Sequence, residues 1–268
     1  MPELTAGQFS LVSNMLSFAI ATLGAAAVFF FINSASGKKY QIAITVSGIV
    51  CAIATYHYLR IYDSFVTAYT MQRVDGTVRY VASGAPFNDF YRYADWFITV
   101  PLLMVELVAV LSLPKGESRR LLTKLVIATA LMIALGYPGE ISTDAGTRWL
   151  WWSLSMVPFV YTLYLLYVEL GAAILREAPE VRGLIKLARN VTVVTWLFYP
   201  VAFAAKTVLT LGSNGEVAMQ VGYSIADITA KAGYGLVIYM IARTKAQLED
   251  VGGEAVSTEN IGLEPARR

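Results

Sequence analysis

The chain has 268 residues, of which 56% are hydrophobic and 15% are charged, and its formal net charge is +2 at pH 7. Soluble domains carry about 25% charged residues, so this composition indicates a membrane-embedded protein, and the small net charge argues against a nucleic-acid partner. The single cysteine, Cys51, and the single histidine, His57, exclude a disulfide framework, a cysteine metal site and a multi-histidine metal centre.

Seven stretches of the chain are long and apolar enough to cross a bilayer, which takes about 20 residues. They cover residues 7–33, 40–66, 87–112, 119–140, 147–173, 182–210 and 217–243. We therefore predict an all-α membrane protein, a seven-transmembrane-helix bundle that forms one domain over residues 1–248. The polar, Gly- and Glu-rich segment 249–268 is predicted to be a disordered tail. No basic region precedes the first apolar stretch, so we expect no cleaved signal peptide.

The connection between the second and third stretches is the longest, and it contains Asp75-Gly76 between two β-prone runs. An Asp-Gly pair in this setting is a strong signal for a β-hairpin with a two-residue turn. We expect a short two-stranded ribbon that lies over one face of the membrane.

Lys and Arg are divided unevenly between the two sets of loops. One set carries Lys38, Lys39, Lys115, Arg119, Arg120, Lys124, Arg176, Arg182, Lys186, Arg243 and Lys245, and the other carries mainly Arg73, Arg79 and Arg148. Cytoplasmic loops carry the excess of positive charge in membrane proteins. This rule predicts that the N-terminus lies outside and the C-terminus lies in the cytoplasm.

Between residues 91 and 107 the third stretch carries three charged residues, Arg92, Asp95 and Glu106. In a helix Thr99 follows Asp95 by about one turn, and Glu106 returns to nearly the same azimuth about 16 Å further along. One helix face thus presents a cation, a carboxylate, a hydroxyl and a second carboxylate in a file. Charges inside a membrane are costly, and such a file is typical of a proton or ion relay.

The seventh stretch carries Asp227 and Lys231, which lie on one helix face because they are four residues apart. A charge at the bilayer centre costs about 2.5–3.5 kcal/mol on insertion scales. This stretch alone leaves two interpretations open. The pair could simply hold helices together, or the lysine could form an imine with a carbonyl ligand and use the aspartate as part of its counterion. The relay in the third stretch favours the imine, because a relay needs a proton-bearing switch at its centre.

Three motifs make the chain recognisable when they are taken together and in order. They are Arg92-Tyr-Ala-Asp-Trp-x-x-Thr-x-Pro-Leu-Leu103, Trp196-x-x-Tyr-Pro200 and Asp227-x-x-x-Lys231. Over all seven helices the chain resembles the microbial (type 1) rhodopsins, and most of all the bacterial proton pumps of the proteorhodopsin and xanthorhodopsin branch. His57, within Tyr56-His-Tyr58, and the segment Gly136-Tyr-Pro-Gly-Glu140 support this placement.

The resemblance implies a role for each charged residue. Lys231 would bind all-trans retinal as a protonated Schiff base, with Asp95 as main counterion and proton acceptor and Asp227 as second counterion. Glu106 would be the proton donor. The remaining implied roles are a hydrogen bond to the acceptor from Thr99, a place on the exit path for Arg92, modulation of Asp95 by His57, and hydrogen bonds to Asp227 from Tyr58 and Tyr199.

The resemblance also implies a retinal pocket. The polyene would lie between Trp96 and Trp196, and the pocket would be completed by Leu103, Met132, Gly136, Trp152, Ser155, Met156, Phe159, Tyr199 and Pro200. Leu103 at the colour-tuning position predicts green absorption. Trp152 stands where carotenoid-binding relatives have glycine, so we expect no ketocarotenoid antenna.

The implied activity is light-driven outward proton pumping by an ion transporter rather than an enzyme. It would be a multi-pass protein of a bacterial inner membrane that interacts with the lipid bilayer and with protons and binds no metal. We expect it to form a homo-oligomer, either a pentamer or a trimer. Two alternatives are a photosensory rhodopsin that signals through a membrane transducer, and a seven-helix transporter or receptor without retinal. Glu106 favours the pump, because photosensors usually lack a carboxylate donor there.

Overall fold

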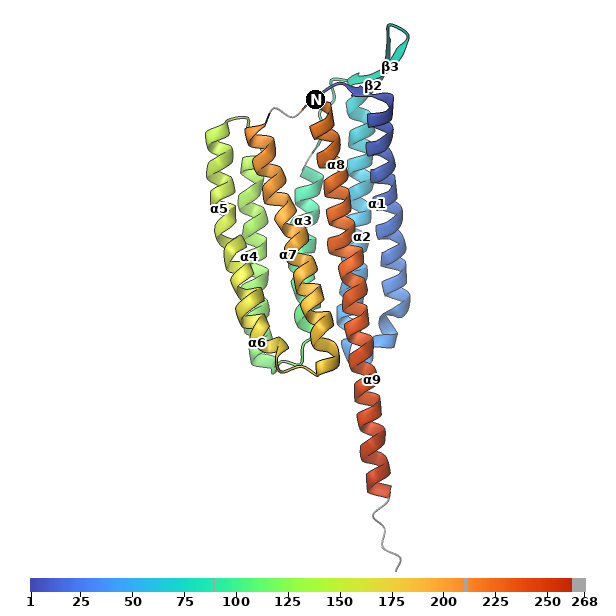
Figure 1. Ribbon diagram of the computed structural model, residues 1–268, viewed down its shortest axis with the longest axis vertical. Coiled ribbons are helices and arrows are strands. Elements are labelled where there is room, and N and C mark those ends of the chain that lie inside the picture. The colour runs from blue at the N-terminus through green and yellow to red at the C-terminus, as the bar shows by residue number, and fades with distance from the viewer. Residues whose placement is uncertain (89, 210–211, 262–268) are drawn as a thin grey trace, which may run out of the picture.

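The computed structural model describes residues 1–88, 90–209 and 212–261, and it shows a bundle of long helices with a small sheet at one end (Figure 1). The long helices are α1 (Ala6–Asn33), α2 (Gln41–Ala68), α3 (Phe90–Ala109), α4 (Lys115–Ile141), α5 (Ala145–Tyr164), α7 (Pro179–Val208), α8 (Ser213–Ile228) and α9 (Tyr234–Ile261). Two π-helical turns make some of them continuous: η2 (Leu165–Glu169) joins α5 to the short α6 (Leu170–Ile174), and η3 (Thr229–Gly233) joins α8 to α9. The predicted seven-helix bundle is confirmed.

Within the described residues, six helices are long and apolar enough to cross a membrane by length and composition, and α3 is not among them. In this count α5 with α6, and α8 with α9, are each one continuous helix. With 20 residues, α3 is long enough to span the hydrocarbon core. It is less apolar because it carries Arg92, Asp95 and Glu106, all of which are buried in the bundle. The helix that does not meet this criterion is therefore the one that carries the charged residues of the predicted relay.

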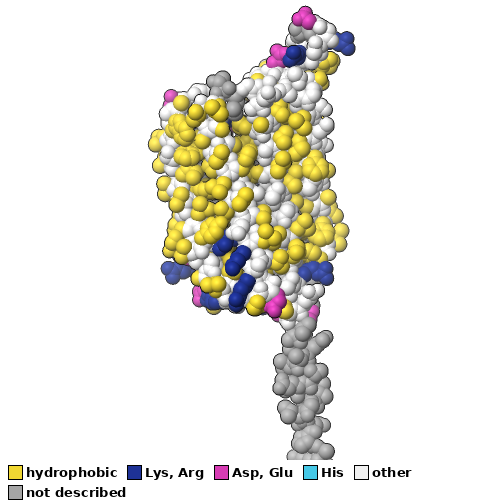
Figure 2. Space-filling model, in the orientation of Figure 1, with side chains coloured by type: hydrophobic (Ala, Val, Ile, Leu, Met, Phe, Trp, Pro, Cys, Tyr) yellow, Lys and Arg dark blue, Asp and Glu magenta, His cyan; other side chains and the backbone are white. Residues whose placement is uncertain are grey.

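The surface of the bundle suits a bilayer. In Figure 2 hydrophobic side chains cover the middle of the visible face, and Lys and Arg side chains gather along the rim opposite the hairpin. We call this rim the basic end and the other the hairpin end. The chain is thus a multi-pass membrane protein.

The predicted hairpin is present at one end of the bundle. Strands β2 (Tyr69–Val74) and β3 (Thr77–Ala82) pair antiparallel, and Val74 is opposite Thr77. The turn residues Asp75 and Gly76 have φ angles of 51° and 76°, the left-handed conformation that a two-residue hairpin turn requires. The described residues add a third strand, β1 (Leu4–Thr5), which pairs with β3. Two residues are too few to show alternation, so the sequence did not predict it.

Two helix starts show how the local sequence sets the boundaries. Thr5 and Gln8 form a capping box at α1, in which each side chain bonds the backbone N–H of the other residue. Asp144 caps α5 by accepting hydrogen bonds from the backbone N–H and the hydroxyl of Thr147 at 2.7 and 2.8 Å. These bonds stabilise the ionised carboxylate, so they lower the pKa of Asp144.

The predicted disordered tail over 249–268 stays a prediction. Helix α9 runs to Ile261, well past the predicted end of the seventh span at residue 243, and residues 262–268 of the tail lie outside the described part of the chain.

Candidate functional site

A buried charge cluster lies at the middle of the bundle. Lys231 is in the π-helical turn η3, and its Nζ lies 2.9 Å from Asp95 Oδ2 and 2.9 Å from Asp227 Oδ1. All three side chains are at most 2% exposed. Removing one member of such a buried cluster leaves an uncompensated charge, which typically costs about 3–5 kcal/mol. The sequence placed Asp227 and Lys231 on one helix face, and the structure shows that Asp95 from α3 contacts the same lysine.

The two carboxylates have different surroundings. Asp227 accepts hydrogen bonds from the Tyr58 hydroxyl at 2.8 Å, the Tyr199 hydroxyl at 2.5 Å and Trp96 Nε1 at 3.2 Å. Both carboxylate oxygens of Asp95, in contrast, lack a well-directed hydrogen bond from the described residues. Protonating Asp227 would disrupt several hydrogen bonds to its charged form, whereas protonating Asp95 would disrupt fewer. Asp95 is therefore the better placed proton acceptor.

His57 and Thr99 both lie beside Asp95. His57 Nδ1 is 3.7 Å from Asp95 Oδ1 and 3.0 Å from the carbonyl oxygen of Ile53. The Thr99 hydroxyl donates to the backbone carbonyl of Asp95 at 2.8 Å, rather than to its carboxylate. The contact that the resemblance implied for Thr99 thus involves the expected residue through a different atom.

Arg92 lies on the hairpin-end side of this cluster, one turn of α3 before Asp95. Its guanidinium group donates a short hydrogen bond to Gln220 and stacks over the ring of Tyr223 at 4.8 Å from the centroid. Gln220 in turn donates to Glu216 at 2.9 Å, near the start of α8. A chain of polar groups thus leads from the cluster toward the hairpin end.

Glu106 lies on the other side of the cluster and is fully buried. Its Oε2 accepts a hydrogen bond from the Ser47 hydroxyl at 2.6 Å, and its Oε1 has no hydrogen-bond partner among the described residues. The sequence did not single out Ser47, because nothing local in α2 relates it to a carboxylate 59 residues away. A hydroxyl in an apolar spanning helix was the only available signal.

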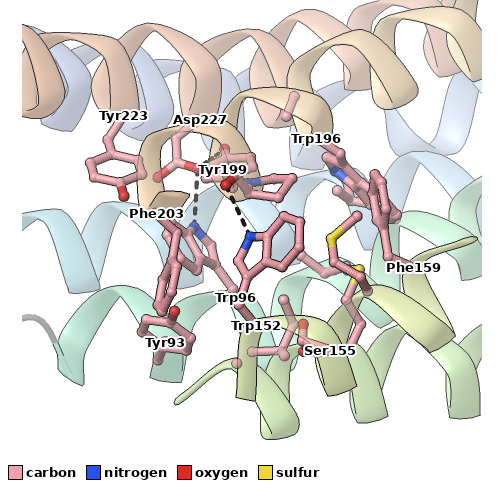
Figure 3. Close-up of a pocket in the computed structure, with 18 of the residues that line it drawn as sticks. Tyr93, Trp96, Trp152, Ser155, Phe159, Trp196, Tyr199, Phe203, Tyr223 and Asp227 are labelled. Atoms are coloured by element: carbon pink, nitrogen blue, oxygen red, sulfur yellow. Dashed lines mark hydrogen bonds between the residues drawn. The ribbon is translucent and has the colours of Figure 1, made fainter. Parts of the chain in front are cut away.

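A cavity adjoins Lys231 and Asp227, and the empty space within it and its opening to the outside amounts to about 830 Å³. Figure 3 shows Asp227 and Tyr223 toward one end of it, and Phe159 and Trp196 toward the other. Of the residues that the resemblance assigned to the pocket, the cavity is lined by Trp96, Leu103, Met132, Gly136, Trp152, Ser155, Met156, Phe159, Trp196, Tyr199 and Pro200. Tyr58 is not part of the lining; it contacts Asp227 instead.

Other lining residues were not predicted, namely Tyr93, Val100, Ile133, Phe203, Tyr223 and Ala230. The chain has 16 Tyr and 12 Phe, and many of them lie exposed on the outer surface of the helices instead of in the cavity. A lipid-facing residue differs from a cavity-facing residue only in its angular position around the helix. This angle could not be predicted accurately, because the helix boundaries were uncertain by several residues.

The residues of the cavity fit a long apolar aldehyde. Lys231 supplies an amine that can condense with the carbonyl, and the two aspartates balance the charge of a protonated imine. A β-carbon at Gly136 would lie 3.5 Å from Tyr93 and 3.6 Å from Ser155. Glycine therefore keeps open a space that a larger side chain would fill.

A multi-pass helical bundle with a buried lysine between two carboxylates, beside an aromatic cavity, defines a membrane protein that binds an apolar carbonyl chromophore covalently. Residues 10–245 match the model of the bacteriorhodopsin-like protein family, and the chain belongs to that family. Its members bind retinal through a lysine Schiff base, and Lys231 is the lysine that this cavity presents.

Known relatives agree with this assignment. The crystal structure of thermophilic rhodopsin is 49% identical in sequence, with a TM-score of 0.88 over 93% of this chain and 99% of that one. The structure of xanthorhodopsin, described as a light-driven ion pump with dual chromophore, is 48% identical, with the same TM-score and coverage.

More distant relatives match as well. The blue-light absorbing proteorhodopsin of Gamma-proteobacterium Hot 75m4 is 29% identical over 85% of each chain. Bacteriorhodopsin from Halobacterium salinarum is 32% identical, and the alignment spans 59% of each chain.

Proposed function

We propose that this protein is a light-driven outward proton pump that carries all-trans retinal at Lys231. One observation carries the proposal: α3 buries two carboxylates three turns apart, and Lys231 Nζ lies 2.9 Å from the one nearer the hairpin end. Retinal bound at Lys231 supplies a light-driven isomerisation that changes the direction and proton affinity of this nitrogen. The proton transfers that follow are carried out by side chains of the protein.

Asp95 receives the proton from Nζ, because its carboxylate is in contact with that nitrogen and has few other hydrogen bonds to lose. Asp227 stays ionised, held by Tyr58, Tyr199 and Trp96, and keeps the site attractive to a new proton. Glu106 holds a proton in an apolar setting beside Ser47 and returns it to Nζ from the opposite side. Acceptor and donor lie on opposite sides of one nitrogen, so the transport has a direction.

The direction across the membrane follows from the proposed orientation. The basic end would face the cytoplasm and the hairpin end the outside. Glu106 would then take protons from the cytoplasm, and Arg92 would lie on the exit side. The membrane would be the inner membrane of a bacterium, and the working form a homo-oligomer, a pentamer or a trimer.

Cells that express the protein and are supplied with retinal are expected to acidify an unbuffered medium in light. The acidification is expected to disappear with a protonophore and to be absent in the Lys231→Ala variant. A pigmented protein that causes no pH change would contradict the proposal. A slow photocycle without transport would favour the photosensory alternative.

We also propose that the protein absorbs green light through Leu103 and has no carotenoid antenna. Trp152 supports the second point, because its indole N–H donates to the carbonyl of Pro200 at 3.1 Å and so bridges α5 and α7 beside the cavity (Figure 3). A carotenoid ring would need the space that this indole fills.

We expect Trp152→Gly to open that space. With added ketocarotenoid, the excitation spectrum of retinal fluorescence in the variant is expected to gain the absorption bands of the carotenoid. The wild-type spectrum is expected not to gain them. Trp149→Gly is the matched control, since Trp149 is one turn away, partly exposed and absent from the lining. Carotenoid bands in the wild type, or their absence in Trp152→Gly together with normal retinal binding, would contradict the role of Trp152.

A further inference from the structure

A second buried ion pair lies at the basic end, away from the retinal cavity. Glu177 and Lys245 are only 4% and 6% exposed, and Lys245 Nζ lies 2.7 Å from Glu177 Oε2. Other ion pairs near this end, such as Lys124 with Glu169 and Arg176 with Glu117, are much more exposed. Burying two charges is costly, and an apolar pair of similar volume is often equally stable. The pair therefore calls for an explanation beyond stability.

The pair connects three segments that are far apart in the sequence. Lys245 on α9 also donates to the carbonyl of Val110 at 2.7 Å and to the hydroxyl of Ser112 at 2.8 Å, just after α3. Glu177, two residues before α7, accepts the Ser112 N–H at 2.5 Å with its other oxygen. The Arg182 side chain on α7 donates to the backbone carbonyl of Glu177 at 2.7 Å. The end of α3, the segment just before α7 and the middle of α9 are thus bound to one another through charge-assisted hydrogen bonds.

The pair closes the bundle above Glu106. Val110, which Lys245 contacts, is one turn of chain beyond Glu106, about 6 Å along the axis. Ile241 is one turn before Lys245 on the same face of α9. Val110, Ile241 and Leu107 are fully buried in one apolar core. A proton that enters from the basic end must therefore cross an apolar layer that lies under the Glu177–Lys245 pair.

We propose that Glu177 and Lys245 are positioning residues that form a gate over Glu106, and that this pair must separate before Glu106 regains a proton from the basic end. Glu177 lies just before α7 and Lys245 lies in the middle of α9, and both contact the segment just after α3. Separating them therefore frees the start of α7 to move away from α3 and α9 and lets water reach the layer below. This inference rests on the proposed proton pumping.

The first test locks the gate. In a Cys51→Ala background, Glu177→Cys and Lys245→Cys are joined by a short, reducible reagent that links two thiols. After a single flash we expect proton uptake, followed with a pH-sensitive dye, to slow at least tenfold, while proton loss from Lys231 Nζ keeps its rate. Reduction of the link restores uptake, so each sample is its own control for folding. The matched control links Lys124→Cys to Glu169→Cys, an ion pair at 2.6 Å that involves neither α7 nor α9.

The second test opens the gate and does not depend on retinal. Glu177→Gln combined with Lys245→Met leaves no unpaired buried charge. In retinal-free protein we expect a cysteine placed at Ile241 to react with a bulk maleimide at least tenfold faster in this double variant than in the Cys51→Ala parent that carries Ile241→Cys alone.

The outcomes separate the two proposals. If the wild type shows no light-driven proton release and uptake, the proposed function fails. If the wild type pumps, but the linked protein takes up protons at the unlinked rate, the gate is overturned. Unchanged labelling at position 241 in the folded double variant also counts against it.

Discussion

Replacing Asp95 by asparagine is expected to lower light-driven proton transport by at least about 10²-fold, the order that a positioned acid or base contributes. The amide keeps the size of the side chain but cannot take up the proton from Lys231 Nζ, which lies 2.9 Å from Asp95 Oδ2. It also removes a negative charge beside that nitrogen, so we expect the absorption maximum to shift to the red. Transport is measured by the initial rate of acidification per pigment, and the shift by the visible spectrum.

A carboxylate on a longer side chain provides the control for this variant. Asp95→Glu is expected to retain measurable transport, because the acceptor group is still present, although its distance to Nζ changes. If Asp95→Asn transports protons at more than a tenth of the wild-type rate, Asp95 is not the acceptor, and the better hydrogen-bonded Asp227 would have to be considered instead.

The features that the sequence predicted are those whose signal lies within one segment. The seven-helix bundle follows from the length and hydropathy of single segments, the hairpin needs only Asp75-Gly76, and both are confirmed. The file on α3 and the pair Asp227–Lys231 follow from helical spacing, which also fixes their order across the membrane. The structure adds that Asp95 from α3 and Asp227 contact the same nitrogen, with Lys231 Nζ 2.9 Å from an oxygen of each.

Features that depend on the relation between distant segments could not be predicted. Ser47 and Glu106 meet across α2 and α3, and Glu177 and Lys245 meet across α9 and the start of α7. In a single sequence, no spacing rule connects such positions. The π-helical turn at Lys231 also lacks a local signal, because Ala and Gly around it are equally compatible with a regular helix.

The hydrogen bonds around the cluster support the different roles that we propose for the two aspartates. Asp227 is held by donors from α2, α3 and α7, so its ionised state is built into the bundle. Asp95 is held mainly by Lys231 and approached by His57 at 3.7 Å. In the proposed pump, the charge at Nζ would therefore face one permanent and one transient counterion, as the transfer of one proton requires.

Replacing Glu106 by glutamine is expected to slow the return of the proton to Lys231 Nζ by about 10²-fold or more, while the dark pigment forms normally. Glu106 is fully buried and lines neither the cavity nor the charge cluster, so the change leaves the absorption spectrum nearly intact. Flash spectroscopy of the visible band measures the recovery. Because the glutamine carries no transferable proton, the nitrogen must wait for one from bulk water.

Two comparisons separate donation by Glu106 from a structural effect. A small permeant weak acid in the medium is expected to restore fast recovery in Glu106→Gln, because it brings a proton to the nitrogen directly. Ser47→Ala, which removes the 2.6 Å hydrogen bond but keeps the carboxyl group, is expected to change recovery much less than Glu106→Gln does. Normal recovery in Glu106→Gln would show that another group reprotonates Nζ, and the direction of pumping could then no longer be attributed to two carboxylates on opposite sides of Lys231.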